Sequence, residues 1–173
     1  MNTPQFPRLA ALTAALLIFE AVYFSTAGPG VIWFIPELAL VASGLIGLLL
    51  GPRAGIGWGA ATGFVQEIFF LSPEGVFGAA PIAYAWCAAL GGWMFFGRAQ
   101  TGRPALGAVA AAGSLAVGHA VALVVGPGQN FLSVSGPAGP WLVSWGIETA
   151  AGGPLLLALL RRWFALEGGE AVP

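Results

Sequence analysis

The chain has 173 residues, of which 58% are hydrophobic and only 8% are charged, and its formal net charge is −1. A water-soluble domain carries roughly a quarter of charged residues, so this composition excludes a soluble globular protein and predicts an integral membrane protein. One domain, covering residues 1–173, is expected at this length. The charge balance and the lack of a basic cluster give no indication of a nucleic-acid partner.

Six apolar segments are long enough to cross the bilayer, which takes about 20 helical residues for roughly 30 Å of hydrocarbon. We predict spans at 9–27, 31–50, 54–71, 76–96, 104–125 and 139–160. Short connections rich in glycine and proline separate most of them, and such links make sequential helices antiparallel neighbours. The sequence therefore predicts an all-α, polytopic membrane protein built as a compact bundle of six transmembrane helices. The longer stretch 126–140 is predicted to be a lid or surface loop, and its conformation stays open.

All six positively charged residues fall on one side of this predicted bundle. They precede the first span, lie between spans two and three and between spans four and five, or follow span six: Arg8, Arg53, Arg98, Arg103, Arg161 and Arg162. Cytoplasmic loops retain positive charge. We therefore predict a multi-pass protein of the plasma membrane with both termini in the cytoplasm.

Small residues recur at helical spacing in the first and third segments. Gly55, Gly59 and Gly63 repeat every four residues and lie on one helix stripe, on which Glu67 takes the next position. In a membrane such a stripe lets another helix approach closely, and we interpret it as a groove for a partner helix that ends in a carboxyl group. Ala10 and Ala14, together with Ala11 and Ala15, form a similar small-residue face. Internal packing is the favoured interpretation of that face, and docking of a partner helix is the alternative.

Four further ionisable groups lie within the predicted spans, toward their outer halves: Glu20, Glu37, His119 and Glu148. An ionisable group at the bilayer centre costs at least about 2.5 kcal/mol, so each is a candidate functional residue. The spans contain no lysine or arginine, which leaves His119, backbone donors, water or a cation from a partner as possible counterparts. Glu37 follows Pro36, so it either satisfies a kink left by the missing proline amide or serves a partner. Glu67 likewise either bonds a neighbouring helix or binds a partner.

No pattern typical of an enzyme is present. The sequence lacks HExxH, GxSxG, a Walker loop and CxxC. Its single cysteine, Cys87, lies in an apolar run and is expected to be a packing residue. The sequence therefore predicts a protein without catalytic residues, metal ligands or cofactor.

One stretch resembles a known family. Pro36-Glu37-Leu38 opens an apolar helix, a Gly-Pro turn follows, then the glycine-spaced helix ending in Glu67 and a short turn with Gly75. This order resembles the bacterial rod-shape protein MreD, and the closing segment ETAAGGPLLLALLRRW, with its paired arginines, is also similar. MreD proteins usually carry aspartate where this chain has Glu37 and Glu67, so the charge is kept.

The resemblance implies a non-enzymatic scaffold in the bacterial inner membrane that belongs to the cell-elongation machinery. Such a protein binds the membrane anchor of MreC and, with it, the actin-like MreB and the RodA glycosyltransferase with its penicillin-binding transpeptidase. It thereby helps to regulate and position peptidoglycan synthesis for the rod shape of the cell. Self-association as a homodimer is left open.

The alternative is the substrate-binding S component of an energy-coupling-factor vitamin transporter. Those proteins resemble this chain in their six helices, Gly-Pro turn and glycine-rich third helix, and they dock their coupling subunit through small residues on the first helix. Ala10 and Ala14 match that feature, and a small molecule would bind from outside under the 126–140 stretch. The sparse polar residues disfavour this alternative. An ion-coupled carrier using the glutamates is a third hypothesis, disfavoured by the lack of an internal repeat.

Overall fold

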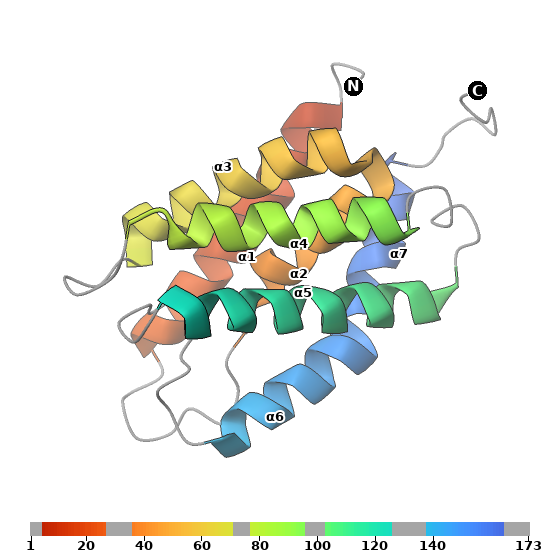
Figure 1. The fold of residues 1–173 in the computed structure, drawn as a ribbon. Helices are drawn as coiled ribbons and strands as arrows, with labels where there is room; N and C mark the ends of the chain where they lie inside the picture. Colours follow the sequence, from red (N-terminus) through yellow and green to blue (C-terminus); the bar gives the residue numbers. More distant parts are fainter. Residues whose placement is uncertain (1–4, 27–35, 71–76, 96–102, 126–137, 165–173) are drawn as a thin grey trace.

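The computed structural model describes residues 5–26, 36–70, 77–95, 103–125 and 138–164. Within these ranges the chain is helical and contains no strand, which confirms the all-α prediction (Figure 1). A helix lies near each of the six predicted segments. In chain order they are α1 (Gln5–Thr26), α2 (Leu38–Leu50), α3 (Pro52–Phe70), α4 (Ala79–Phe95), α5 (Pro104–Val125), and a last helix made of α6 (Ala138–Ile147), the π-helical turn η2 (Glu148–Gly152) and α7 (Gly153–Phe164).

Three of these helical segments are long and apolar enough to cross a membrane: Phe6–Tyr23, Pro104–Val121 and Leu142–Trp163. The prediction of six spans is thus met in part. α2 is apolar but has only 13 residues, a length of about 20 Å, because Pro36 precedes it and Gly51-Pro52 follows it. α4 has 17 residues. α3 has 19, but its glycines and Gln66 and Glu67 make it less apolar.

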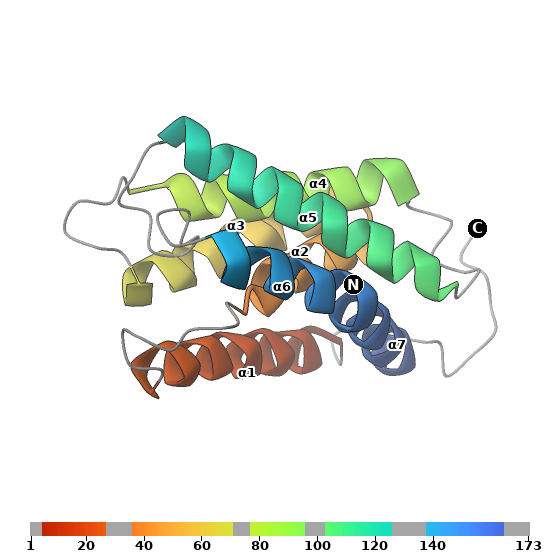
Figure 2. The same ribbon diagram turned by 90° about the horizontal axis from the view of Figure 1, so that it is seen from below.

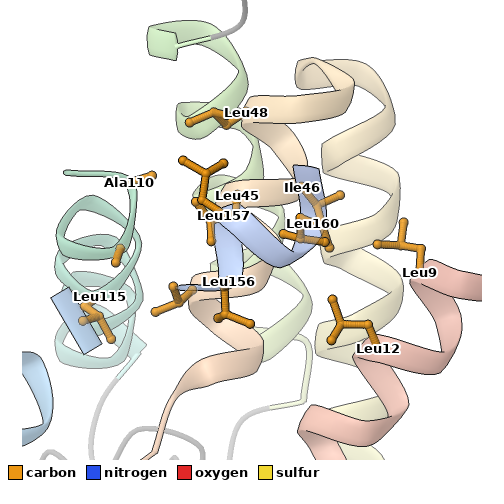
Figure 3. Close-up of a cluster of buried hydrophobic side chains, with 12 residues drawn as sticks. Leu9, Leu12, Leu45, Ile46, Leu48, Ala110, Leu115, Leu156, Leu157 and Leu160 are labelled. Atoms are coloured by element: carbon orange, nitrogen blue, oxygen red, sulfur yellow. The ribbon is translucent and has the colours of Figure 1, made fainter. Parts of the chain in front are cut away.

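The short helix α2 occupies the centre of the bundle. Each of its residues from Ala39 to Leu48 is buried, as expected for a helix that is apolar on every side. The other helices surround it (Figures 1 and 2). Figure 3 shows the larger apolar cluster, in which side chains from α1, α2, α5 and α7 point toward one another; they include Leu12, Leu45, Leu115 and Leu157.

The glycine stripe of α3 packs against α4 at Gly59 and Gly63 and against Gly47 of α2 at Gly55. A Cβ atom built on Gly59 would clash with the carbonyl oxygen of Tyr84, and one on Gly63 would lie 2.5 Å from that of Ala80. The expected close helix contact is therefore present. The interpretation of the stripe as a groove for a partner helix is wrong, because α4 and α2 of the same chain cover it. A short link makes α4 the antiparallel neighbour of α3, so α4 packs on the stripe before a partner helix could.

Helix α1 lies at the edge of the bundle (Figure 2). Its inward face is buried and includes Leu9, Leu17 and Glu20. Ala10 is half-buried, whereas Ala14 is exposed, as are Ala11 and Ala15. The favoured interpretation of this alanine face as internal packing is therefore wrong for Ala11, Ala14 and Ala15, which point away from the bundle, and is met only in part at Ala10.

Most of the predicted loop at 126–140 lies outside the described residues. Only its last three residues, Ala138 to Pro140, are described, and they form the first turn of α6. The predicted span at 139–160 is a helix, but a π-helical turn interrupts it at Glu148. Pro154 explains this turn, because proline has no amide hydrogen and its ring crowds the carbonyl four residues earlier. The helix widens by one residue, and the Gly153 amide donates to the Glu148 carbonyl.

Candidate functional site: a buried carboxyl cluster at the start of α2

Two carboxyl groups from distant parts of the chain cap the amino-terminal end of α2. The first amides of a helix have no partner within the helix, and the side chain of the N-cap residue, Glu37, makes no capping bond. Glu148 Oε1 instead accepts a hydrogen bond of 2.6 Å from the Glu37 amide. Glu20 Oε1 accepts one of 2.8 Å from the Ala39 amide. Helix α2 is therefore tied to α1 and to η2 at the same end.

This placement explains how acidic side chains are tolerated in an apolar interior. Glu20 and Glu148 are each only 1% exposed. The amino-terminal end of a helix carries a partial positive charge, and its free amides are strong donors to a carboxyl group. The caps thus supply the stabilising contacts for which the sequence offers no intramembrane lysine or arginine.

The Glu37 side chain faces His119. Their Oε1 and Nε2 atoms lie 3.4 Å apart, and both side chains are buried. His119 Nδ1 lies 2.6 Å from the Leu115 carbonyl oxygen. A carbonyl oxygen only accepts, so Nδ1 carries a proton. Without another proton, Nε2 and the Glu37 carboxylate would both be acceptors. A hydrogen bond between them therefore needs one further proton, held by either the acid or the imidazole.

The structure therefore brings together all four of the predicted buried polar residues, Glu20, Glu37, His119 and Glu148. The His119 and Trp145 rings also form a T-shaped pair, with ring centres 5.4 Å apart. The expected kink at Glu37 is wrong. α2 begins at Leu38, so Pro36 precedes the helix, and the Glu37 carbonyl accepts the regular helical bond from Val41.

Two further polar residues, Tyr84 and Gln66, extend the cluster. Neither was identified as a candidate from the sequence. The Tyr84 hydroxyl donates a hydrogen bond to Gln66 Oε1, and both side chains are buried. The Gln66 side chain also lies beside Glu20. The available signal was an uncharged amide inside the predicted span at 54–71, next to the ionisable Glu67.

Glu67 caps a different helix and lies apart from this cluster. Both of its carboxyl oxygens accept from the Gly78 amide, at 2.8 and 2.9 Å. Gly78 directly precedes α4 and has a φ of +99°, a conformation that glycine adopts without strain. Glu67 is 1% exposed. This geometry favours the structural interpretation of Glu67 over partner binding.

Replacing Glu67 with glutamine should change stability by less than about 1 kcal/mol, because the amide oxygen still accepts from Gly78. Glu67→Leu removes the acceptor and leaves the half-buried Gly78 amide unpaired, which should cost about 1–3 kcal/mol. Thermal unfolding of the two variants in detergent measures the difference. Equal unfolding midpoints would show that the cap does not stabilise the fold.

The cluster is not arranged as a metal site: within the described ranges, no three histidine, cysteine, aspartate or glutamate residues are placed to hold an ion together. Cys87 is buried, and its thiol contacts the Ser114 carbonyl oxygen at 3.2 Å, as expected of a packing residue. What the cluster does is connect α1, α2, α5 and the last helix through polar contacts at one end of the bundle. Comparison with protein-family models, with curated proteins and with solved structures finds no significant match to this chain.

Proposed function

We propose that this protein is a non-enzymatic membrane scaffold that binds the transmembrane helix of a partner protein. In this proposal all six helices lie in the bacterial inner membrane with both termini in the cytoplasm. The arginines of the described residues support that orientation, because they lie at the helix ends opposite the carboxyl cluster. Arg8 Nη1 also lies 3.4 Å from the Trp163 carbonyl oxygen, so the start of α1 and the end of α7 meet.

The observation that carries the proposal is the fixed orientation of α1. Arg8 holds its beginning, the Trp58 Nε1 group donates to Thr13 Oγ1 at 3.1 Å in its middle, and Glu20 bonds to α2 near its end. These three contacts hold one face of α1 inward. The opposite face, with Ala11, Ala14, Ala15 and Ile18, is exposed.

A helix held in this way offers a defined surface to a second helix. Small side chains let two helix backbones approach closely in lipid, where dispersion contacts and interhelical hydrogen bonds drive association. The glycine stripe of α3, by contrast, is already in contact with α4 and α2 of the same chain. Docking is therefore assigned to the alanine face of α1.

The resemblance to MreD suggests the partner. In this proposal the alanine face receives the membrane anchor of MreC, and the complex brings MreB and RodA with its transpeptidase to the site of wall growth. The polar cluster acts by holding α1 in register against α2. Engagement of Glu20 and Glu148 in helix capping supports a structural role for them over an acid–base role.

The same exposed alanine face favours one alternative, the S component of a vitamin transporter. There Ala14 and its neighbours would dock a coupling subunit. A substrate would bind at the outer end of the bundle.

Gentle purification from the native membrane distinguishes the two functions. The scaffold proposal expects mass spectrometry to find a single-span protein with a periplasmic coiled coil, or the wall-synthesis enzymes. Recovery of a bound vitamin, or of a coupling subunit with ATPases, would replace it with the transport function.

The Ala14→Leu variant should lose the co-purified partner while the protein stays folded. A leucine at this exposed position points away from the described helices and holds a docked helix away. Ala116→Leu on the exposed face of α5 is the matched control, and it should retain the partner. Quantitative mass spectrometry of the two preparations measures the difference, which we expect to be at least tenfold. Equal recovery from both variants would remove α1 as the docking helix.

A further inference from the structure

The carboxyl cluster at the start of α2 has fewer hydrogen-bond donors than three ionised carboxylates would need. Glu148 and Glu20 each accept one backbone amide through Oε1. Their Oε2 atoms, and Oε2 of Glu37, are closed to solvent and have no hydrogen bond to any residue of the described ranges. A buried carboxylate with an unpaired oxygen is strongly disfavoured, whereas a protonated acid is uncharged and carries its own donor. The unpaired oxygens therefore point to protons bound by the acids themselves.

The three carboxyl groups would also repel one another if all were ionised. Each lies close enough to the other two for their negative charges to interact, and carboxyl groups that share a buried site do not all ionise together. The sequence has no lysine, and the described arginines lie at the opposite helix ends. The partial positive charge at the start of α2 amounts to roughly half an elementary charge. It offsets one carboxylate at most, so two of the three groups must hold a proton.

The other polar groups that face the cluster do not supply the missing positive charge. Tyr84 and Cys87 of α4 belong to weakly acidic residue types that are neutral at pH 7, and Gln66 of α3 is uncharged. His119 of α5 lies 3.4 Å from Glu37 Oε1. A buried ion pair repays its desolvation only when the remaining lone pairs are also satisfied, and Glu37 Oε2 has no donor among the described residues. The proton of this pair is therefore on Glu37, and the imidazole is neutral.

We propose that the cluster is a proton-binding site that holds two protons among Glu20, Glu37 and Glu148 at neutral pH. One proton is on Glu37, and the other is shared between Glu20 and Glu148. The bound protons allow α1, α2 and η2 to meet at one end of the bundle. Their release adds negative charges at this end and loosens α1 from α2. This inference goes beyond the proposed scaffold function and does not depend on it.

Infrared spectroscopy of the full chain in lipid vesicles at pH 7 detects the bound protons, because the C=O stretch of a protonated carboxylic acid is separate from the carboxylate bands. The native protein should show this acid band, and Glu37→Gln should lose the part that belongs to one proton. Glu67→Gln, which removes a buried carboxyl group outside the cluster, is the matched control and should keep that part. A native spectrum without the acid band, or a band that Glu37→Gln leaves unchanged, would overturn the site.

The stability of the protein should fall as the pH rises. Unfolded glutamates lose their protons above about pH 4.3, so the folded cluster then holds more protons than the unfolded chain, and higher pH favours unfolding. Between pH 7 and 8, where the unfolded histidine is largely neutral, the unfolding constant should rise about tenfold per pH unit more steeply in the native protein than in Glu37→Gln. Denaturant unfolding in detergent measures both slopes, and Glu67→Gln should keep the native slope. Equal slopes in the native protein and Glu37→Gln would contradict the proposal. If Glu37→Gln fails to fold, a native unfolding constant that does not rise with pH would contradict it as well.

Discussion

Replacing Gly59 with leucine is expected to abolish the folded bundle, whereas the same change at Gly57 should leave it intact. Any Cβ atom at Gly59 would clash with the backbone of Tyr84 in α4, and that backbone cannot move without separating the two helices. Gly57 lies two residues away on the same helix, and a Cβ there would meet nothing within 4 Å. Overpacking typically costs about 1–3 kcal/mol and occasionally more, and here the obstacle is backbone rather than a side chain that can change rotamer.

Thermal unfolding in detergent, followed by near-ultraviolet circular dichroism, compares Gly59→Leu with Gly57→Leu. Both variants gain the same helix propensity, so their difference reports the contact with α4. A Gly59→Leu protein with the native midpoint but without its co-purified partner would mean that the stripe serves a partner helix after all.

Removing the Glu148 carboxyl group should produce the second large effect. Glu148→Leu leaves the Glu37 amide without its acceptor at 2.6 Å and breaks the polar contact between η2 and α2. A buried amide left unpaired costs about 1–3 kcal/mol. Glu148→Gln keeps a carbonyl oxygen at the same place and should cost less than about 1 kcal/mol.

The two Glu148 variants are compared by their unfolding midpoints under the same conditions. Ala150→Leu, an exposed position in the same π-helical turn, controls for general sensitivity of this segment. If Glu148→Leu unfolds at the native temperature, the carboxyl cap contributes nothing to stability, and the cluster loses its proposed structural role.

The sequence predicted the helices well and their environment less well. Apolar runs and Gly-Pro breaks located a helix near each expected segment, because these signals are local. The lengths of the helices were harder to predict. The predicted second span includes Pro36, whereas in the structure Pro36 precedes α2 and Glu37 is the N-cap residue. The π-helical turn had a local cause in Pro154, which the unbroken prediction for 139–160 overlooked.

The membership of the candidate site was predictable, but its assembly was not. Glu20, Glu37, His119 and Glu148 were identified because ionisable groups are rare in membrane spans. Their convergence at the start of α2 depends on how four helices pack, which spacing along one helix does not reveal. Gln66 was missed because its amide carries no charge.

The small-residue patterns also do not reveal which helix lies beside them. A stripe such as Gly55, Gly59 and Gly63 indicates that a helix will approach, but the pattern is the same whether that helix belongs to the chain or to a partner. The structure reversed the two expectations, since the glycine stripe faces α4 and α2 of the same chain and Ala14 faces outward.

Site-specific photo-crosslinking in the native membrane tests the docking face of α1 most directly. A photoreactive amino acid at position 14 should give a discrete adduct with a single-span protein that carries a periplasmic coiled coil. The same group at position 116, on the exposed face of α5, should crosslink only to lipid. A protein adduct of equal yield from both positions, or none from position 14, would contradict the scaffold function proposed for this helix.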